Sequence, residues 1–439
     1  MSDDASLKRK NRDYGFETRM IHAGTQPEPV TGARQTPIFQ NTSYVFHDAE
    51  HAASLFNLQT FGFIYSRLTN PTVAALEERL ANLEGGRGGT CCASGHAAQI
   101  LAFFALMEPE DRFIASTRLY GGSITQFGKT FKKFGWQADF VDVDDPAAVR
   151  RALTPKTKAI FIESLANPGG VVSDLEALAA VAREAEIPLI VDNTMATPYL
   201  CRPFEWGADI VVHSTTKFLS GNGTSVGGAM IDSGRFDWTA AGAKFPGLAA
   251  PEPAYHGLNF HETFGDMALT MQAHAVGLRD LGATMAPLNA FQTLLGTETL
   301  SLRMERHCAN AKAVAEHLEG HPQVAWVSSA ALASSPYRAL AEKYLPLGAG
   351  SVFTLGLKGG YAAGVKMVES CELFSHLANI GDVRSLILHP ASTTHRQLTE
   401  EQQAAAGAGP EVVRLSIGLE TVDDIIADLD QALAAAAKA

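Results

Sequence analysis

The sequence predicts an α/β protein with a mostly parallel central sheet, helices on both faces of that sheet, and a smaller α+β domain at the C-terminal end. Short apolar runs alternate with amphipathic stretches between about residues 85 and 235, which is typical of a parallel sheet covered on both faces. From about residue 268 the pattern changes to long helical stretches with a few short apolar runs. The chain has 439 residues, 46% of them hydrophobic, which allows two large domains with sizeable cores.

Four buried parallel strands are predicted for the central sheet. They are the apolar runs at 112–116, 158–164, 187–193 and 208–214. Amphipathic helices are expected between them, as at 175–186, where apolar residues recur with helical spacing. A helix is also predicted at 91–107, and residues 226–234 are predicted to form another short strand.

The smaller domain is predicted to follow a bridging helix at 267–283. Its expected elements are a helix at 301–320 and short strands at 351–357 and 412–420. We therefore place a large domain at residues 65–275 and a small domain at residues 276–439.

Charge, cysteine and hydropathy patterns argue against several classes of protein. The net charge of −12 is unfavourable for non-specific binding to nucleic acids or membrane surfaces, since either favours a basic face. Five cysteines without a CxxC pair, and 14 histidines without an HExxH pattern, predict buried thiols in a reducing compartment and no metal site. The sequence contains neither an apolar run of roughly 20 residues nor a signal-peptide core. We expect a soluble cytoplasmic protein with no nucleic-acid or membrane partner.

The segment VVHSTTKFLSGNGTSVGGAM, residues 211–230, leads a predicted buried strand into a cluster of hydroxyl groups with one lysine. In one interpretation the strand ends in a solvated loop and Lys217 faces water. In the other, Lys217 points into a closed polar pocket and takes part in chemistry. The neighbouring strand ends decide between them, because the carboxyl ends of the strands in an open parallel sheet form the ligand crevice.

Polar or aromatic residues follow all four predicted strands. They are, in chain order, Tyr120, Asn167, Asp192, and the group of Ser214, Thr216 and Lys217. The predicted helix at 91–107 carries Ser94, Gly95 and His96 in its first turn, where free backbone N–H groups and the helix dipole form an anion site. Each residue alone is explained by a helix cap or a turn. Their concentration at one edge of one sheet favours a pocket.

These residues together predict a site for pyridoxal 5′-phosphate (PLP). The ligand that they specify has a phosphate, a flat ring with a basic nitrogen, and an aldehyde. A lysine that forms a Schiff base and an acidic partner for the ring nitrogen are the expected signature of this cofactor. We assign Lys217 to the aldehyde, Asp192 to the ring nitrogen, and the hydroxyls of Ser214 and Thr216 to the phosphate.

A dinucleotide site is the main competing interpretation of the same region. Gly221, Gly223 and Gly227 follow a predicted strand as GxGxxxG. A dinucleotide-binding loop should open a helix, whereas residues 226–234 are predicted to form a strand. The sequence also has no GxxxxGK[ST] motif, and we discount nucleotide binding.

The sequence resembles the Cys/Met-metabolism family of PLP enzymes, which have fold type I. The resemblance extends nearly from end to end, over residues 18–420. Its most specific motifs are YSRLTNPT (65–72), ASGHAAQ (93–99), LYGGS (119–123), VDNT (191–194), HSTTKF (213–218) and SLILHPASTTH (385–395). The resemblance implies that residues 1–64 reach a partner subunit and that residues 65–275 bind PLP.

The resemblance also implies roles for individual residues. Tyr65 and Arg67 are expected to reach the cofactor phosphate of a neighbouring subunit. Tyr120 is expected to stack on the pyridine ring and assist proton transfer, and Asn167 to contact the ring hydroxyl and the substrate. Arg414 would hold the substrate carboxylate as a fork, with Ser385 nearby. A dimer is then the minimum active unit, and a tetramer is the habit of the family.

Segments 242–260 and 381–398 are similar to those of the family branch that acts on O-acetylhomoserine. We therefore expect γ-replacement, in which sulfide or methanethiol displaces acetate and forms homocysteine or methionine. The cystathionine γ-synthase and methionine γ-lyase branches stay open as alternatives, although Gly122 stands where γ-lyases have a cysteine. A PLP-binding regulatory protein without activity is the alternative from another class.

Overall fold

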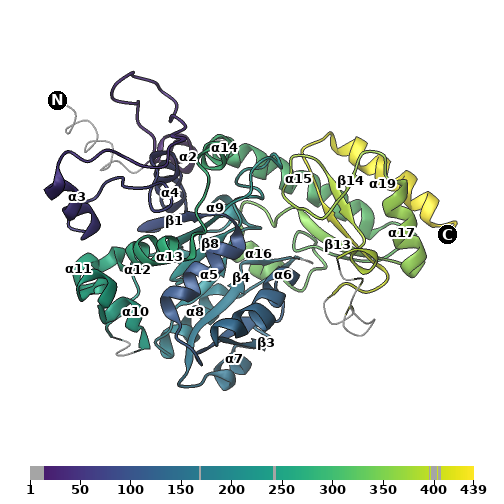
Figure 1. Ribbon diagram of the computed structural model, residues 1–439. Helices are drawn as coiled ribbons and strands as arrows, with labels where there is room; N and C mark the ends of the chain where they lie inside the picture. Colours follow the sequence, from purple (N-terminus) through teal and green to yellow (C-terminus); the bar gives the residue numbers. More distant parts are fainter. Residues whose placement is uncertain (1–13, 168–169, 241–243, 395, 397–402, 404–406) are drawn as a thin grey trace.

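The computed structural model describes residues 14–167, 170–240, 244–394, 396, 403 and 407–439. Parts of the predicted segments 1–64, 242–260, 381–398 and 385–395 therefore lie outside the described residues. Figure 1 shows a large body around a central sheet, with a second lobe on one side of it. Helix α3 (Ala49–Phe56), in the N-terminal segment, projects from the opposite side of the large body.

The central sheet has seven strands in the order β1-β9-β8-β7-β4-β2-β3. Their bounds are Gly88–Cys92 (β1), Arg112–Ser116 (β2), Gln137–Val141 (β3), Thr157–Glu163 (β4), Leu189–Asp192 (β7), Ile210–His213 (β8) and Gly228–Asp232 (β9). Strands β3, β2, β4, β7 and β8 are mutually parallel, whereas β9 is antiparallel to β8 and to β1. The predicted mostly parallel sheet is confirmed, as are its four predicted strands and the short strand at 226–234.

The start of the predicted helix at 91–107 is wrong. Cys91 and Cys92 end strand β1, where they pair with Ala229 and Gly228 of β9, and helix α5 begins only at Gly95. Strand β3 was also not predicted. It lies at the edge of the sheet and is only partly buried, so it lacks the continuous apolar run of the inner strands.

Side chains of the inner strands alternate between two cores, one on each face of the sheet. Ile160 and Ile162 of β4 pack in one core with helices α4 (Pro71–Glu84) and α8 (Leu175–Glu184). Phe161 points to the other face, where it packs in a core with Phe103 of α5 (Gly95–Leu106). This period of two along a strand places helices on both faces, as predicted.

The second lobe is built on a five-stranded sheet in the order β12-β13-β16-β15-β14. Its strands are Val324–Ser328 (β12), Val352–Leu357 (β13), Ser375–His376 (β14), Leu386–Leu388 (β15) and Val412–Ser416 (β16). Helices α15 (Leu300–Glu319), α17 (Gly360–Ser370) and α19 (Val422–Ala436) share a core with this sheet. The smaller α+β C-terminal lobe is therefore confirmed.

The connection between the two lobes differs from the expected one. Residues 268–281 are helical as α12 (Ala268–Gln272), a π-helical stretch and α13 (Arg279–Leu281), but Ala273 and Leu278 are buried in the core that contains α5. Helices α14 (Pro287–Thr297) and α15 lead to the second sheet instead. The division of the chain at residue 275 itself stays a prediction.

Other short elements complete the described chain. They are α2 (Phe16–His22), α6 (Gly121–Thr125), α7 (Pro146–Ala152), α9 (Thr197–Leu200), α10 (Pro246–Ala249), α11 (Phe260–Phe264), α16 (Arg338–Tyr344), and the two-residue strands β5 (Leu165–Ala166), β6 (Val171–Val172), β10 (Pro251–Glu252) and β11 (Leu258–Asn259).

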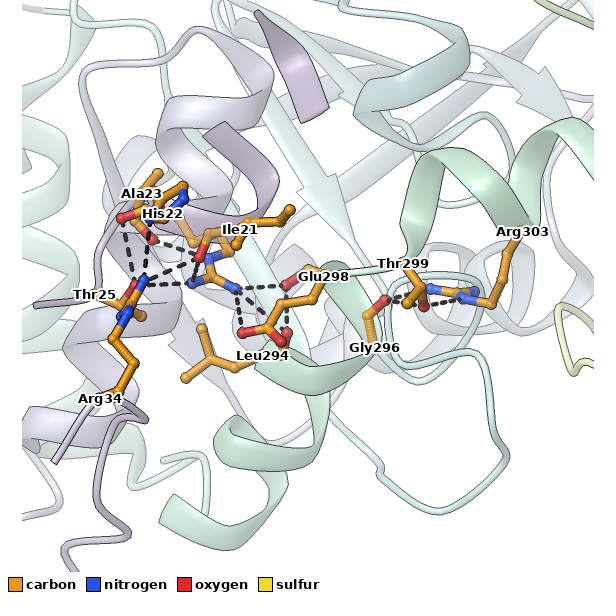
Figure 2. Close-up of polar contacts among 12 residues, drawn as sticks. Ile21, His22, Ala23, Thr25, Arg34, Leu294, Gly296, Glu298, Thr299 and Arg303 are labelled. Carbon is orange, nitrogen blue, oxygen red and sulfur yellow. Dashed lines mark hydrogen bonds and ion pairs between the residues drawn. The ribbon is translucent and has the colours of Figure 1, made fainter. Parts of the chain in front are cut away.

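One fully buried arginine fastens the N-terminal segment to the large body. Arg79 of α4 donates to the carbonyl oxygens of Ile21 and Ala23, each at 2.9 Å. On its other side the guanidinium lies 3.6 Å from Glu298, next to the end of α14. Figure 2 shows Ile21, Ala23 and Thr25 facing Leu294 and Glu298, and the bonds of Arg79 to both groups hold residues 21–25 against helices α4 and α14.

Candidate functional site

A cavity of about 200 Å³ lies at the carboxyl ends of β4, β7 and β8, facing the second lobe. Nine of the predicted site residues line it: Ser94, Gly95, His96, Tyr120, Asn167, Asp192, Ser214, Lys217 and Arg414. They come from six regions of the chain, and Arg414 belongs to β16 of the second sheet. The expected convergence of the strand ends is therefore present in the structure.

Helix α5 points its N-terminus at the cavity. Ser94 caps the helix, since its hydroxyl accepts the backbone N–H of Ala97 at 3.1 Å. The first N–H groups of a helix have no partner within it, so those of Gly95 and His96 are available to a ligand. A side chain at Gly95 would lie 2.8 Å from the Cβ atom of Ser214, which explains the glycine at this close approach.

Two carboxylates lie side by side at this edge. Glu163 and Asp192 end β4 and β7 and are paired in register. Burial raises the pKa of both groups, and the charge of Asp192 raises that of Glu163 further. The backbone N–H of Thr194 donates to Asp192 Oδ1 at 2.9 Å, which stabilises the ionised form. A cationic partner in the cavity would favour ionisation of the pair.

Lys217 is a half-buried amine whose charge no carboxylate balances within the described part of the chain. Burial lowers its pKa to about 8, and the positive charge of Arg414 contributes to the shift. The amine donates a hydrogen bond to the side-chain oxygen of Asn379. About a tenth of the amine is therefore neutral at pH 7, far more than for an ordinary lysine, and the neutral form is what a nucleophile or a base requires.

The turn that carries Lys217 is held from behind by a second buried arginine. Arg303 Nη1 donates to the carbonyl oxygen of Phe218 at 2.7 Å, and Nη2 donates to that of Gly296 at 2.6 Å. Figure 2 shows Arg303 beside Gly296 and Thr299, where α14 gives way to α15. This cation fixes the backbone next to Lys217.

Arg414 is the second cation of the cavity. Its Nη1 donates to Asn167 Oδ1 at 3.4 Å and its Nη2 to the carbonyl oxygen of Asn379 at 3.2 Å. Burial lowers the pKa of Arg414 to about 10. Its hydrogen-bond partners are neutral, so the planar guanidinium remains able to donate hydrogen bonds to an incoming carboxylate.

Tyr120 provides an aromatic surface beside the helix N-terminus. Its ring stacks on His96 with centroids 5.9 Å apart and planes inclined by 26°. Burial lowers the pKa of His96, so the imidazole is neutral at physiological pH. A side chain at Gly122 would lie 2.4 Å from Tyr120 Cε1, so this glycine permits the observed ring position.

Four predicted site residues, all within the described part of the chain, lie outside the cavity lining. Thr216 exchanges hydrogen bonds with the backbone of Gly227, and Ser385 is fully buried, where it donates to Glu420 at 2.9 Å. Tyr65 is 42% exposed, and the Arg67 guanidinium lies 5.5 Å from its ring centroid. Within one chain these side chains do not reach the cavity.

Several lining residues were missed in the sequence. Glu163 ends an apolar run in the same way as Asp192 does, and this signal could have identified it. Gln99 lies one helical turn after Gly95, and Asn379 comes from the segment between β14 and β15. Gln99 stands in the motif ASGHAAQ (93–99), which could have identified it, whereas Asn379 carries no local signal because only the tertiary fold brings it to the cavity.

The cavity fits the predicted cofactor. His96 Nε2 and Gln99 Oε1 are buried there without a hydrogen-bond partner, so polar groups remain for a ligand to satisfy. An anion-binding helix end, an acidic side chain and a lysine with a lowered pKa line one space. In the described part of the chain no group of side chains is arranged to hold a metal ion, and no helix is both long and apolar enough to cross a bilayer.

Comparisons with known proteins agree with this site. The family model described as Cys/Met metabolism PLP-dependent enzyme matches residues 17–434. O-acetyl-L-homoserine sulfhydrylase of Leptospira meyeri is 48% identical over 431 residues, covering 96% of this chain and 97% of the relative. O-acetyl-L-homoserine sulfhydrylase 1 of Thermus thermophilus is 49% identical over 421 residues, covering 95% of this chain and 100% of the relative.

A solved structure gives the same picture. A Campylobacter jejuni protein assigned as an O-acetylhomoserine (thiol)-lyase superposes with a TM-score of 0.92 at 41% identity, covering 96% of this chain and 100% of that one. That crystal structure contains N′-pyridoxyl-lysine-5′-monophosphate. The similarity therefore extends over both lobes.

Proposed function

Because this chain belongs to the family of Cys/Met metabolism PLP-dependent enzymes, we propose that it is the member that converts O-acetyl-L-homoserine and sulfide into L-homocysteine and acetate. The C–O bond at the γ-carbon breaks, a C–S bond forms there, and methanethiol in place of sulfide yields methionine. This activity belongs to methionine biosynthesis. The observation that carries the proposal is that Lys217, Asp192 and Arg414 line the same cavity.

PLP is the cofactor, and the residues that would hold it follow from the cavity. The free N–H groups of α5 and the hydroxyl of Ser214 would bind the phosphate, with Thr216 holding the adjoining turn. Asp192 would keep the ring nitrogen protonated, Tyr120 and Asn167 would contact the ring and its hydroxyl, and Lys217 would form the covalent link. When bound, PLP supplies an electron sink that stabilises negative charge at the α-carbon of the substrate.

The side chains of the cavity then divide the remaining work. Arg414 binds the substrate carboxylate through two parallel N–H groups, which orients the amino acid before reaction. The oxygen of Tyr120, in its deprotonated form, receives a proton from the incoming amine. Lys217 Nζ, once free, removes the α-proton and later returns a proton, a role that its lowered pKa suits.

We propose that the active unit is a dimer and the full assembly a tetramer, in the cytoplasm. Tyr65 and Arg67 would complete the phosphate site of the partner subunit. Exposed apolar side chains in the N-terminal segment support this assignment: Val45 is 97% exposed and Phe61 is 79% exposed. Packing of residues 1–64 against a second copy of the chain would remove these apolar side chains from water.

The γ-lyase alternative is disfavoured by the surroundings of Gly122. A Cβ atom at this position would approach Tyr120 Cε1 to 2.4 Å and His96 Cε1 to 3.0 Å. A cysteine would therefore displace the Tyr120 ring from its present position. The site as built suits a chain without a thiol there.

The proposed function is tested by sulfide-dependent release of acetate from O-acetylhomoserine, with cysteine replacing sulfide in a parallel sample. We expect homocysteine with sulfide and little product with cysteine. Preferential formation of cystathionine would assign the chain to the γ-synthase alternative. A protein that binds PLP, and is therefore yellow, but does not convert homoserine esters, cysteine or methionine would overturn the proposal in favour of a regulatory protein.

A further inference from the structure

Glu163 is a buried carboxylate in the cavity that the proposed function leaves without a role. It ends β4, is 4% exposed, and lines the cavity between Tyr120 and Asp192. Its Oε1 atom accepts the backbone N–H of Tyr120 at 2.6 Å. Its Oε2 atom accepts the backbone N–H of Asn167 at 2.9 Å. One side chain thus uses both of its oxygens on the main chain of two other residues in the cavity.

The two N–H groups belong to different segments. Tyr120 follows β2 and directly precedes α6, whereas Asn167 follows the short strand β5. Asn167 in turn accepts from Arg414 of the second lobe at 3.4 Å. A chain of hydrogen bonds therefore connects the backbone of the aromatic residue, the side chain of Glu163, Asn167 and the guanidinium.

We propose that Glu163 is a positioning residue, which sets the relative placement of Tyr120 and Asn167, and through Asn167 that of Arg414, by holding one backbone N–H on each carboxylate oxygen. The part concerning Arg414 and the substrate rests on the proposed function. The part concerning the two segments stands on the geometry alone.

An ionised carboxylate suits this arrangement best. An ionised carboxylate has acceptors on both oxygens, whereas an amide or a protonated acid presents a donor on one side. A donor there would face a backbone N–H and leave it without an acceptor, which is costly in a buried site. Burial and the neighbouring Asp192 raise the pKa of Glu163, so the two N–H groups act against an environment that disfavours its charge.

Asp209 offers a matched control at the opposite end of the strands. It is a carboxylate that accepts the backbone N–H of Leu189 at 2.9 Å, and burial raises its pKa to about 6. It lies before β8, away from the cavity lining. Asp209→Asn therefore also replaces a buried carboxylate that accepts a backbone N–H with an amide, at a position outside the cavity.

The experiment compares Glu163→Gln with Asp209→Asn in the full chain without cofactor, using hydrogen exchange followed by mass spectrometry. A hydrogen bond to a charged group stabilises enough that its loss should speed exchange about tenfold or more. We expect this acceleration in peptides that contain Tyr120 or Asn167 in Glu163→Gln, and unchanged exchange of those peptides in Asp209→Asn. Unchanged exchange in Glu163→Gln, or equal acceleration in both variants, would overturn the proposal.

Steady-state kinetics of the cofactor-loaded enzyme gives the second measurement. A small misplacement of catalytic and binding groups costs roughly 100-fold in rate, so we expect kcat/KM to fall about 10- to 100-fold, with KM for the homoserine ester raised and kcat lowered. Asp209→Asn should keep both constants. A fall in Glu163→Gln that is matched by Asp209→Asn would contradict a positioning role.

Glu163→Asp keeps the experiment decisive if the amide variant does not fold. The aspartate retains the charge but is one methylene shorter, so it can hold only one of the two segments. Faster exchange in one of the two peptides supports the proposal, and no change in either overturns it. The exchange measurement needs no substrate, so its outcome is independent of which reaction the enzyme catalyses.

Discussion

The two edges of the seven-stranded sheet differ in whether their lysines and arginines form ion pairs. At the amino edge, Lys158 lies 3.5 Å from Asp111 and Lys156 lies 2.8 Å from Glu110. At the carboxyl edge, Lys217 and Arg414 donate only to neutral groups within the described part of the chain, although Asp192 and Glu163 line the same cavity. The two cations without an ion pair lie in one cavity, where an ionic ligand could bind them.

The difference has an energetic basis. A buried charge without an ionic partner is costly, and a bound ligand of opposite charge is one way to offset that cost. The lowered pKa values of Lys217 and Arg414 and the raised pKa values of Asp192 and Glu163 record that cost. The amino edge, with its ion pairs, serves stability instead.

Replacing one lysine at each edge gives the largest expected difference in kcat. Lys217→Ala should lower kcat by at least about 10⁴-fold, because it removes the group that we propose to form the covalent link and to move the α-proton. Lys158→Met should keep the kcat of the folded protein but destabilise it by about 3–5 kcal/mol, since Asp111 loses its partner. Initial rates and urea unfolding measure the two effects. A Lys217→Ala enzyme with near wild-type kcat would remove the distinction between the edges.

The carboxylates provide the next contrast. Asp192→Asn should lower kcat by about 10²–10³-fold, because in the proposed site the ring nitrogen would lose the negative charge that keeps it protonated. Asp232, a buried aspartate that ends β9 at the amino edge, has a pKa raised by burial to about 7. Asp232→Asn should keep the wild-type kcat, and the absorbance spectrum of bound cofactor should change only in Asp192→Asn. Equal losses in both variants would show that any buried carboxylate matters in this way.

Arg414→Lys tests whether the unpaired guanidinium is a carboxylate fork. Lysine retains the charge but not the two parallel donors, so KM for the homoserine ester should rise about 10-fold, with a smaller change in kcat. Inhibition by amino acids should weaken in parallel, whereas binding of their decarboxylated analogues should not. An unchanged KM would place the substrate carboxylate elsewhere.

The smallest effect concerns pH. Uptake of PLP by the cofactor-free protein needs the neutral amine of Lys217, so its rate should rise with pH and level off above about 8, the lowered pKa of this group. Arg414→Met removes a neighbouring positive charge and should move the midpoint to higher pH. Burial is the larger cause of the shift, so the midpoint should stay below the ordinary lysine value of 10.5. Stopped-flow absorbance measures this rate, and a midpoint that moves to lower pH would contradict the assignment.

The sequence was sufficient to predict cavity-lining residues that stand at or after a strand end. Asp192, Lys217 and Asn167 each follow an apolar run, and parallel pairing brings such positions to one edge. Glu163 obeys the same rule, since it stands at the end of the apolar run 158–164, but it was not assigned to the site. Asn379 could not be found, since it reaches Lys217 from a loop of the other lobe.

Local sequence patterns were less reliable where tertiary packing determines the partner of a side chain or the burial of a strand. The hydroxyls of Thr216 and Ser385 stand in recognisable motifs, yet they bond to the main chain of Gly227 and to Glu420 in the described structure. Strand β3 was missed because an edge strand is buried only in part. Tyr65 and Arg67 stay predictions for the partner subunit.

The most direct test of the account is to reduce the cofactor-loaded protein with borohydride and locate the pyridoxyl group by peptide mass spectrometry. The unpaired charges at the carboxyl edge predict a single modified peptide with the label on Lys217. A label on Lys158, or labels distributed over surface lysines, would contradict the account.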